Sequence, residues 1–304
     1  MNVTITGATG FIGSQLTRAL LNRNHAVHVL GRRGSAQLPS SVRFSEWNPQ
    51  SEPPPESLAD CDALIHLAGE PVAQRWTTEV KELIRSSRVE STRHLVNALS
   101  TQSHRPSVFV CGSAIGYYGS RGDEILSEGS TPGNDFLAQV VRDWEQAAGL
   151  AESLGIRVVR MRTGVVLGKN GGALQKMLPP FRLGLGGRIG SGKQWMSWIH
   201  LDDLVGLILY AIDKTAIRGA VNGAAPDPVT NAEFTGTLAA VLHRPAIFPV
   251  PAIGLRIVFG EMAEVILSSQ RVIPKAAVDA GYAFQYPGLR AALNAILDSL
   301  SAVQ

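Results

Sequence analysis

The segment that most constrains this chain is a glycine-rich turn, TGATGFIG (residues 6–13). It follows the β-branched run VTIT (3–6) and precedes a stretch whose apolar residues recur at helical spacing. Gly7, Gly10 and Gly13 would permit a tight turn, a close approach of the backbone to a ligand, and close packing of helix on strand. The helix would present free N–H groups and its positive dipole end at the same point. The pattern predicts a phosphate-binding turn; the alternative is that the glycines only turn the chain.

The rest of the first half alternates apolar strands with helical segments. Several strands are apolar on both faces, which is typical of a parallel sheet covered by helices on both sides. The sequence therefore predicts an α/β fold with a Rossmann-type, doubly wound parallel sheet. We expect strands at 25–30, 62–69, 107–112 and 156–162, and helices at 79–100 and 134–154.

The second half changes character after residue 168. A Gly- and Pro-rich stretch contains no clear α/β unit, and the apolar helix that follows WIH and the run AVNGAAP then resume the first pattern. Thr230 and Glu233 form a capping-box pattern for a helix over 231–242. We predict two units: a Rossmann domain from 1–168 plus 199–222, which carries the phosphate-binding turn, and a small mixed substrate lobe from 169–198 plus 223–304.

Composition excludes several classes of protein. The net charge is +3 and no Lys/Arg-rich run is present, which argues against nucleic-acid binding but suits an anionic ligand. The two cysteines, Cys61 and Cys111, lie in no metal-binding pattern, so we expect free thiols and no metal. The start lacks a signal-peptide pattern. The apolar segment 251–267 is short and carries three charges, which predicts a core helix rather than a membrane span. We expect a cytoplasmic protein.

The second predicted strand ends in VLGRRG, which bears on cofactor choice. A site for NAD would carry Asp or Glu here to bind the ribose hydroxyls. This chain has Gly31 followed by Arg32 and Arg33. Two guanidinium groups without a carboxylate favour the 2′-phosphate of NADP(H), and the alternative is a solvated basic turn.

These motifs, with DALIHLAGE, SAIGYYG and WIHLDDL, resemble those of the extended short-chain dehydrogenase/reductases, which include sugar-nucleotide epimerases and dehydratases. The blocks SRVESTRHL, LPPFRLGLGGRIGSGKQW and SSQRVIPKAAVDAGYAFQYP resemble an atypical branch, generally labelled "epimerase family", with a short C-terminal domain of uncertain role. The resemblance covers nearly the whole chain.

The resemblance implies a set of cofactor-binding residues. One group would hold the pyrophosphate, a second would meet the adenosine phosphate, and a third would line the cofactor after the strand in DALIHLAG. Two further residues would contact the cofactor directly or border its nicotinamide. In that order they are Gly7, Thr9, Gly10, Phe11, Ile12 and Gly13; Gly31, Arg32 and Arg33; Leu67, Ala68 and Gly69; and Arg88 and Val166.

The catalytic pair of the family is missing. Where ordinary members carry a tyrosine and, four residues on, a lysine, this chain carries Leu137 and Val141, and the usual Ser position falls on Ala114. Ser113, Tyr117 and Tyr118 are the candidate replacements, because they lie at the carboxyl end of a strand, where such sheets present reactive groups. Arg88 or Arg142 could supply the positive charge. The alternative is that both tyrosines pack as structural aromatics and Ser113 is a turn residue.

Three other features have a structural as well as a functional interpretation. His200 in WIHLDD is either a base or, more commonly, an anchor for the start of a helix, and His66 is expected to be a satisfied core residue. GRIGSGK (187–193) fits a nucleotide-triphosphate loop but lacks the following Ser or Thr and a preceding strand. We expect a loop over the substrate cleft instead, with Arg182, Lys193 and Trp195 available to an anionic or planar ligand.

Two functions remain open from the sequence. One is an NADP(H)-dependent oxidoreductase or epimerase-like enzyme that acts on a small, anionic or nucleotide-linked substrate with rearranged acid/base residues. The other is a binding protein that senses NADP(H) without catalysis. The resemblance also implies a homodimer, paired through the helices at 79–100 and 134–154.

Overall fold

The protein, in a computed structural model, is built on one large parallel sheet. The structure describes residues 1–32, 38–169 and 171–301. Within these, seven strands pair in the order β11-β7-β5-β4-β1-β2-β3, and every pair is parallel. The order reverses between β1 and β4, which is where such sheets open a crevice at their carboxyl ends. The predicted fold class is confirmed.

The strands of this sheet and the helices that connect them follow the sequence pattern closely. Their bounds are β1 (Asn2–Thr6), α1 (Phe11–Asn22), β2 (Ala26–Gly31), β3 (Arg43–Glu46), η1 (Pro55–Ser57), β4 (Ala63–His66), α2 (Thr78–Ser100), β5 (Val108–Ala114), η2 (Ile115–Tyr118), α3 (Phe136–Gly149), η3 (Leu150–Leu154), β7 (Arg157–Thr163), α5 (Leu201–Asp213) and β11 (Gly219–Gly223).

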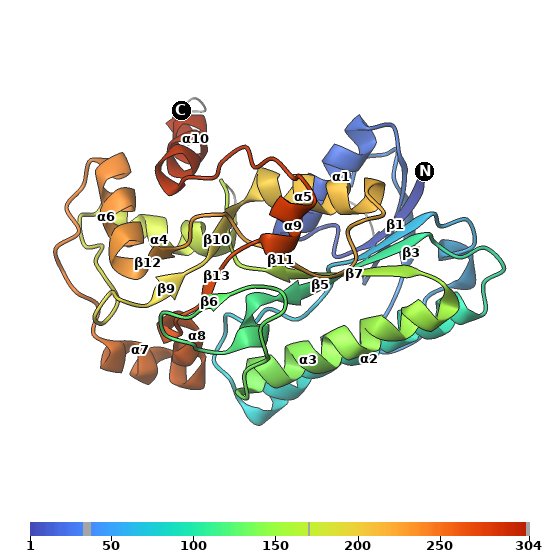
Figure 1. The fold of residues 1–304 in the computed structure, drawn as a ribbon, viewed down its shortest axis with the longest axis horizontal. Helices are drawn as coiled ribbons and strands as arrows, with labels where there is room; N and C mark the ends of the chain where they lie inside the picture. The colour runs from blue at the N-terminus through green and yellow to red at the C-terminus, as the bar shows by residue number, and fades with distance from the viewer. Residues whose placement is uncertain (33–37, 170, 302–304) are drawn as a thin grey trace.

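Helices cover both faces of the sheet. In Figure 1, α2 and α3 lie along one face, and α1 and α5 lie along the other. One apolar core packs between the sheet and α1 and α5, and a second packs between the sheet and α2 and α3. Burial on both faces explains why the central strands are apolar throughout.

A smaller lobe lies beyond the carboxyl edge of the sheet, to the left in Figure 1. It has its own apolar core, which includes Leu174, Leu178, Phe234 and Leu293. Its elements are β6 (Ile125–Leu126), β8 (Val165–Leu167), α4 (Gly172–Arg182), β9 (Trp195–Met196), β10 (Trp198–His200), β12 (Val229–Thr230), α6 (Asn231–Leu242), α7 (Ala252–Phe259), η4 (Gly260–Met262), α8 (Ala263–Leu267), β13 (Arg271–Val272), α9 (Lys275–Asp279) and α10 (Leu289–Ser301), with α9 set against the large sheet.

The predicted division into two units stays a prediction. A separate core in the smaller lobe supports it, but the boundary is not clean. Ala277 is buried in the core of the large sheet, and Tyr282 and Phe284 pack against that core. The segment that contains them was predicted to belong wholly to the smaller lobe.

The structure differs from the predicted elements in four places. The predicted helix over 134–154 ends as an α-helix at Gly149 and continues as η3, and strand β3 was not predicted. Helix α4 forms in the Gly- and Pro-rich stretch. The predicted core helix over 251–267 is wrong, because α7, η4 and α8 are separate and no residue of α7 is buried. No helix in the described part of the chain is long and apolar enough to cross a membrane.

Candidate cofactor cleft and the catalytic positions beside it

The glycine turn closes tightly on itself between β1 and α1. Gly7 has a φ of +72°, and a Cβ on it would lie 2.8 Å from the backbone nitrogen of Ala68. A Cβ on Gly13 would lie 2.1 Å from the carbonyl oxygen of Gly7. The backbone of Gly10 donates to that same oxygen at 3.0 Å. Glycine is therefore required at both Gly7 and Gly13, and the first turn of α1 is held directly over the end of β1.

The start of α1 lies against a second glycine segment that follows β8. Cβ atoms on Gly168, Gly171 and Gly172 would each lie within 2.8 Å of the Phe11 ring. A Cβ on Gly172 would also lie 2.8 Å from the carbonyl oxygen of Val166. The structure thus brings together two predicted cofactor positions, Phe11 and Val166, which are far apart in the sequence.

The segment after β4 forms the other wall of the predicted cleft. Leu67 and Ala68 are half-buried and Gly69 is exposed, with a Cβ on Gly69 only 3.2 Å from the guanidinium carbon of Arg88. The Nη1 atom of Arg88 donates to the carbonyl oxygens of Glu70 (3.0 Å) and Ile84 (3.1 Å). Arg88 thus lies beside the backbone of Gly69 and Glu70, next to the residues that were predicted to line the cofactor.

Arg88 is a charged group in a partly dry environment. Burial lowers the pKa of Arg88 to about 10, with the Glu70 carboxylate opposing the shift, so the side chain remains a cation at neutral pH. Its guanidinium lies 5.4 Å from the Trp144 ring. Among the described residues, no carboxylate pairs with it and neither Nε nor Nη2 finds an acceptor. Such a cation is suited to an anionic ligand.

The remaining predicted cofactor positions are accessible or lie outside the described residues. Thr9, Gly10 and Arg32 are exposed, Ile12 and Gly31 are half-buried, and Arg33 is not among the residues that the structure describes. Gly31 ends β2, and a Cβ there would lie 3.3 Å from the Phe44 ring. Arg32 follows it directly, so at least one guanidinium is available at the end of this strand.

Ser113 and Tyr118 belong to a buried polar network. The Ser113 hydroxyl donates to Oε1 of Glu145 at 2.6 Å. The Tyr118 hydroxyl donates to Oδ1 of Asn222 at 2.7 Å and accepts from Nη1 of Arg162 at 3.0 Å. Tyr118 is wholly buried, and this burial raises the pKa of its phenol, against the effect of Arg162. The hydroxyls of Ser113 and Tyr118 are therefore both engaged within the fold. Ser113 lies in β5 and is not the turn residue that the alternative described.

The centre of this network is an ion pair between α3 and β7. Arg162 donates through Nε and Nη2 to the two carboxylate oxygens of Glu145, both at 2.8 Å. The side chains are 4% and 10% exposed. Neighbouring contacts connect the network to the C-terminal segment, because Glu128 accepts from the backbone nitrogens of Asn222 and Ala276.

Tyr117 differs from its neighbour. Its ring is half-buried and lies 3.5 Å from the guanidinium carbon of Arg162, with the Tyr118 ring against its edge at 5.3 Å. No described residue forms a hydrogen bond with its hydroxyl. Nearby, Leu137 packs 3.6 Å from the position of a Cβ on Gly116, and Val141 is buried. Arg142 is exposed.

His200 and the glycine-lysine loop take structural roles. Nδ1 of His200 accepts from the backbone nitrogen of Asp202 and caps α5, and its ring packs on Tyr286 at 4.0 Å. Burial lowers the pKa of His200, although the two following aspartates oppose this. In the loop, a Cβ on Gly187 would lie 1.6 Å from the carbonyl oxygen of Phe248. That glycine is needed for packing against the α6–α7 connection.

The predicted ligand contacts of this region are only partly available. Arg182 and Lys193 are exposed. The indole nitrogen of Trp195 donates to Asp123 at 2.7 Å, and Arg271 covers its ring at 4.2 Å. Trp195 is therefore already in contact on its polar edge and on one face.

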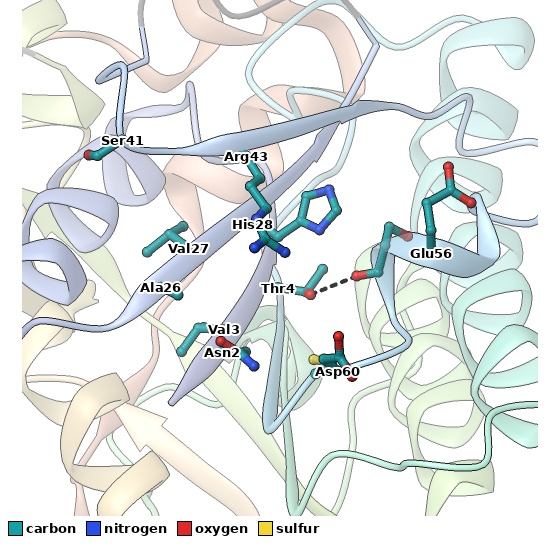
Figure 2. Close-up of a pocket in the computed structure, with 12 residues that line it drawn as sticks. Asn2, Val3, Thr4, Ala26, Val27, His28, Ser41, Arg43, Glu56 and Asp60 are labelled. Atoms are coloured by element: carbon teal, nitrogen blue, oxygen red, sulfur yellow. Dashed lines mark hydrogen bonds between the residues drawn. The ribbon is translucent and has the colours of Figure 1, made fainter.

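A separate hollow lies at the opposite, amino-terminal edge of the sheet. It is lined by the first residues of β1 and β2 together with Arg43 and Glu56, and Figure 2 shows the Arg43 side chain beside that of His28. Its volume is about 70 Å³, well below the roughly 300 Å³ that a small-molecule site needs. In the part of the chain that the structure describes, no group of three His, Cys, Asp or Glu side chains could hold a metal ion.

Sequence reasoning missed Glu145, Arg162, Asn222 and Glu128. Arg162 had a visible signal, since it is charged and lies in the otherwise apolar strand IRVVRMR. A buried charge needs a partner, and Glu145 lies in the helix that precedes this strand. Asn222 and Glu128, whose side chains bond to backbone groups, carry no such signal in the sequence.

Comparisons with known proteins bear on the whole chain. A family model described as the NAD dependent epimerase/dehydratase family matches residues 3–222, and one described as a domain of unknown function, DUF1731, matches residues 250–296. The chain is 41% identical over 309 residues to the chloroplastic epimerase family protein SDR39U1 homolog of Arabidopsis thaliana, covering 98% of this chain and 87% of the relative.

Two solved structures are similar throughout. The human epimerase family protein SDR39U1 (isoform2), crystallised with NADPH, is 37% identical with a TM-score of 0.89, covering 98% of this chain and 99% of that one. The nucleoside-diphosphate sugar epimerase from Corynebacterium glutamicum is also 37% identical with a TM-score of 0.79, covering 98% of this chain and 58% of that one. These matches confirm the resemblance carried by the sequence motifs, including the short C-terminal domain.

Proposed function

Because the chain belongs to the NAD dependent epimerase/dehydratase family, we propose that it binds NADPH along the carboxyl edge of its large sheet. We further propose that it uses the cofactor as an oxidoreductase or epimerase-like enzyme on a small-molecule substrate. The observation that carries the proposal is the glycine turn. Gly7 and Gly13 admit no side chain, so the backbone at the mouth of α1 stays open to a pyrophosphate.

The preference for NADPH over NADH rests on the end of β2. Gly31 and the exposed Arg32 stand where a carboxylate would bind the ribose hydroxyls of NAD. A guanidinium at this place would pair with the 2′-phosphate that distinguishes NADPH. The human relative crystallised with NADPH supports the same choice.

Arg88 is the residue that we assign to the charge missing at Val141. Its guanidinium lies beside Gly69 and remains charged at neutral pH, and among the described residues its Nε and Nη2 atoms find no protein acceptor. Arg142, the other candidate from the sequence, is exposed on α3 and does not share these contacts. Arg88 would hold an anionic group of the cofactor or the substrate at the mouth of β4.

Tyr117 is the residue that we assign to proton transfer. Tyr118 and Ser113 are committed to Asn222, Arg162 and Glu145, whereas the Tyr117 hydroxyl is unpaired among the described residues. The bound nicotinamide would supply or accept a hydride, and an alkoxide formed from a carbonyl must then receive a proton in place. A half-buried phenol at the carboxyl end of β5 could donate it.

The substrate class that we propose is small and anionic, with a nucleotide-linked sugar as its main representative. Arg88 and the exposed Arg182 and Lys193 would suit phosphate or carboxylate groups. The name of the Corynebacterium glutamicum relative, a nucleoside-diphosphate sugar epimerase, supports this class. A homodimer through α2 and α3 remains part of the proposal, although the exposed side chains on these helices are mainly charged or polar.

Calorimetric titration tests the cofactor assignment. Wild-type protein should bind NADPH more tightly than NADH, and Arg32→Ala should weaken NADPH binding by about tenfold while leaving NADH unchanged, because one charge-assisted contact is lost. Arg18→Ala, which removes an exposed arginine on α1, is the matched control and should change neither. Absence of binding by the wild type at millimolar NADPH would refute the proposal.

A second function is favoured by one observation: the usual catalytic positions have become apolar or structural. Leu137 and Val141 cannot move a proton, and the Ser113 hydroxyl is taken by Glu145. Under this alternative the protein senses NADPH without turnover. A panel of carbonyl compounds and nucleotide sugars, followed at the absorbance of NADPH, separates the two functions.

Two matched variants refine that assay. If the protein is an enzyme of the proposed type, Tyr117→Phe should abolish turnover with little change in NADPH affinity. Tyr118→Phe should mainly lower stability, because it leaves a buried amide oxygen of Asn222 without its donor. Equal turnover in the wild type and Tyr117→Phe would remove Tyr117 from the mechanism.

A further inference from the structure

A buried chain of hydrogen bonds runs from β1 through β4 to α2. Nδ1 of His66 lies 2.6 Å from the hydroxyl of Thr6, and Nε2 of His66 lies 3.1 Å from the hydroxyl of Ser91. All three side chains are fully buried. These hydrogen bonds therefore connect β1, β4 and α2 inside the core, where solvent does not reach.

The outer contacts of the two hydroxyls indicate the direction of both hydrogen bonds to His66. The backbone nitrogen of Ala68 donates to Thr6 at 3.2 Å, so the Thr6 hydroxyl is free to donate its own proton to Nδ1 of His66. The Ser91 hydroxyl donates to the carbonyl oxygen of Ser87 at 2.7 Å, so it accepts from Nε2. A hydroxyl has one proton to donate, so these contacts favour a neutral His66 with its hydrogen on Nε2.

Electrostatics agree with this assignment. Burial lowers the pKa of His66 to about 3, and the nearby charge of Arg88 acts in the same direction. Protonation would place a second donor against the Thr6 hydroxyl and a second cation near Arg88. The neutral form is thus the one that the surroundings accept.

The series of hydrogen bonds through His66 reaches the predicted cofactor cleft at both of its ends. Thr6 immediately precedes Gly7, and Ala68 is the residue against which Gly7 is packed. At the other end, Ser87 accepts from the backbone nitrogen of Glu70 at 3.0 Å, and the neighbouring Arg88 donates to the Glu70 carbonyl oxygen. The segment 67–70 is thereby held from β1 on one side and from α2 on the other.

We propose that His66 is a positioning residue for the cofactor cleft: it joins the glycine turn, the 67–70 segment and the Arg88 turn of α2 into one rigid platform. This inference rests on the proposed binding of NADPH. A core histidine with a merely structural role would stabilise the fold without affecting ligand affinity. The hydrogen bonds from Thr6 through His66 to Ser91, which we call the His66 relay, instead set the spacing of the groups that would contact the cofactor.

The experiment compares conservative pairs on β1. Thr6→Val keeps the shape of the side chain but removes the hydroxyl, and Thr6→Ser keeps the hydroxyl. Thr4→Val is the matched control, since Thr4 is also buried on β1 and its hydroxyl donates to the Ser57 carbonyl oxygen at 2.9 Å. Thr6→Val should raise the NADPH dissociation constant by about tenfold, with Thr6→Ser close to wild type and Thr4→Val unchanged.

Two further measurements do not depend on the ligand. Nitrogen-15 NMR of the wild type should report a neutral His66 with its hydrogen on Nε2, and hydrogen exchange at the Ala68 amide should accelerate in Thr6→Val but not in Thr4→Val. If the wild type does not bind NADPH, the proposed function is refuted, whereas these two measurements still test the hydrogen bonds through His66. Equal affinities in Thr6→Val and Thr4→Val, an Nδ1-protonated ring or an unchanged Ala68 exchange rate would overturn the relay.

Discussion

The ion pair between Glu145 and Arg162 should be among the most sensitive points of the fold. Replacing Glu145 by Leu leaves the Arg162 guanidinium, with a side chain only 4% exposed, without its carboxylate. Two charge-assisted hydrogen bonds of 2.8 Å are lost, together with the acceptor of Ser113. At about 1.5–3 kcal/mol for each charged hydrogen bond, the loss is roughly 3–6 kcal/mol, in line with the 3–5 kcal/mol typical of a broken buried pair.

The double variant separates the pair from its surroundings. Arg162→Met alone should destabilise by a similar amount, because among the described residues it leaves the buried Glu145 carboxylate with the Ser113 hydroxyl as its one remaining donor. Glu145→Leu combined with Arg162→Met removes both charges, so its loss should be far smaller than the sum of the two single losses. We expect about 1–3 kcal/mol, which reflects the contacts of Tyr118 and Glu128 that Arg162 also satisfied.

Urea unfolding followed by tryptophan fluorescence measures these losses, since buried Trp144 directly precedes Glu145 in α3. Glu90→Leu breaks the exposed i,i+3 pair with Arg93 on α2 and serves as the control, with an expected change below about 1 kcal/mol. Additive losses in the double variant, or a loss in Glu145→Leu no larger than that of the control, would refute the argument from burial.

Three other predictions follow from single contacts. Because burial lowers the pKa of His66 from its ordinary 6.5 to about 3, the folded state resists protonation of this ring. His66 should therefore contribute a loss of stability of up to about 1.4 kcal/mol per pH unit as the pH drops below 6.5, and a His66→Gln variant should show a shallower loss than the wild type in urea titrations. Gly13→Ala should abolish NADPH binding or folding, because its Cβ meets the Gly7 carbonyl oxygen at 2.1 Å. Gly236→Ala, with open space around it, should leave both unchanged; circular dichroism measures the folding and calorimetry the binding. Thr230→Ala removes the capping box of α6 and should lower the unfolding free energy by about 1 kcal/mol in the same urea assay.

Local signals in the sequence were sufficient for much of the fold. The individual strands and helices of the large sheet, the glycine turn and the capping box of α6 each have a signal within a short stretch of sequence, and the structure contains all of them. Helix α4 was missed because NGG and Pro179–Pro180 indicate a loop. Leu174, Leu178 and Phe181 nevertheless recur at helical spacing and are buried in the small-lobe core, so tertiary packing outweighs the unfavourable local residues.

Helix α7 shows the opposite failure. Its sequence is apolar, which predicted burial, yet Ile253 and Ile257 are 69% and 71% exposed. An apolar composition shows that a helix can be buried, but it does not show that another part of the protein covers it. The network around Glu145 was missed for a related reason: it joins α3, β7, β11 and the C-terminal segment, and only the folded arrangement brings these together.

Cofactor binding and proton transfer depend on different kinds of atoms in the predicted cleft. Cofactor binding in this fold depends mainly on backbone groups and on glycines that keep side chains away, and substitutions elsewhere leave that geometry intact. Proton transfer depends on particular side chains, and here Ser113 and Tyr118 serve the buried network. A chain of this kind can keep its cofactor and still lose the usual catalytic pair. The proposed activity would therefore depend on groups outside that pair. Among the described residues, the Tyr117 hydroxyl and the Nε and Nη2 atoms of Arg88 are without a protein hydrogen-bond partner.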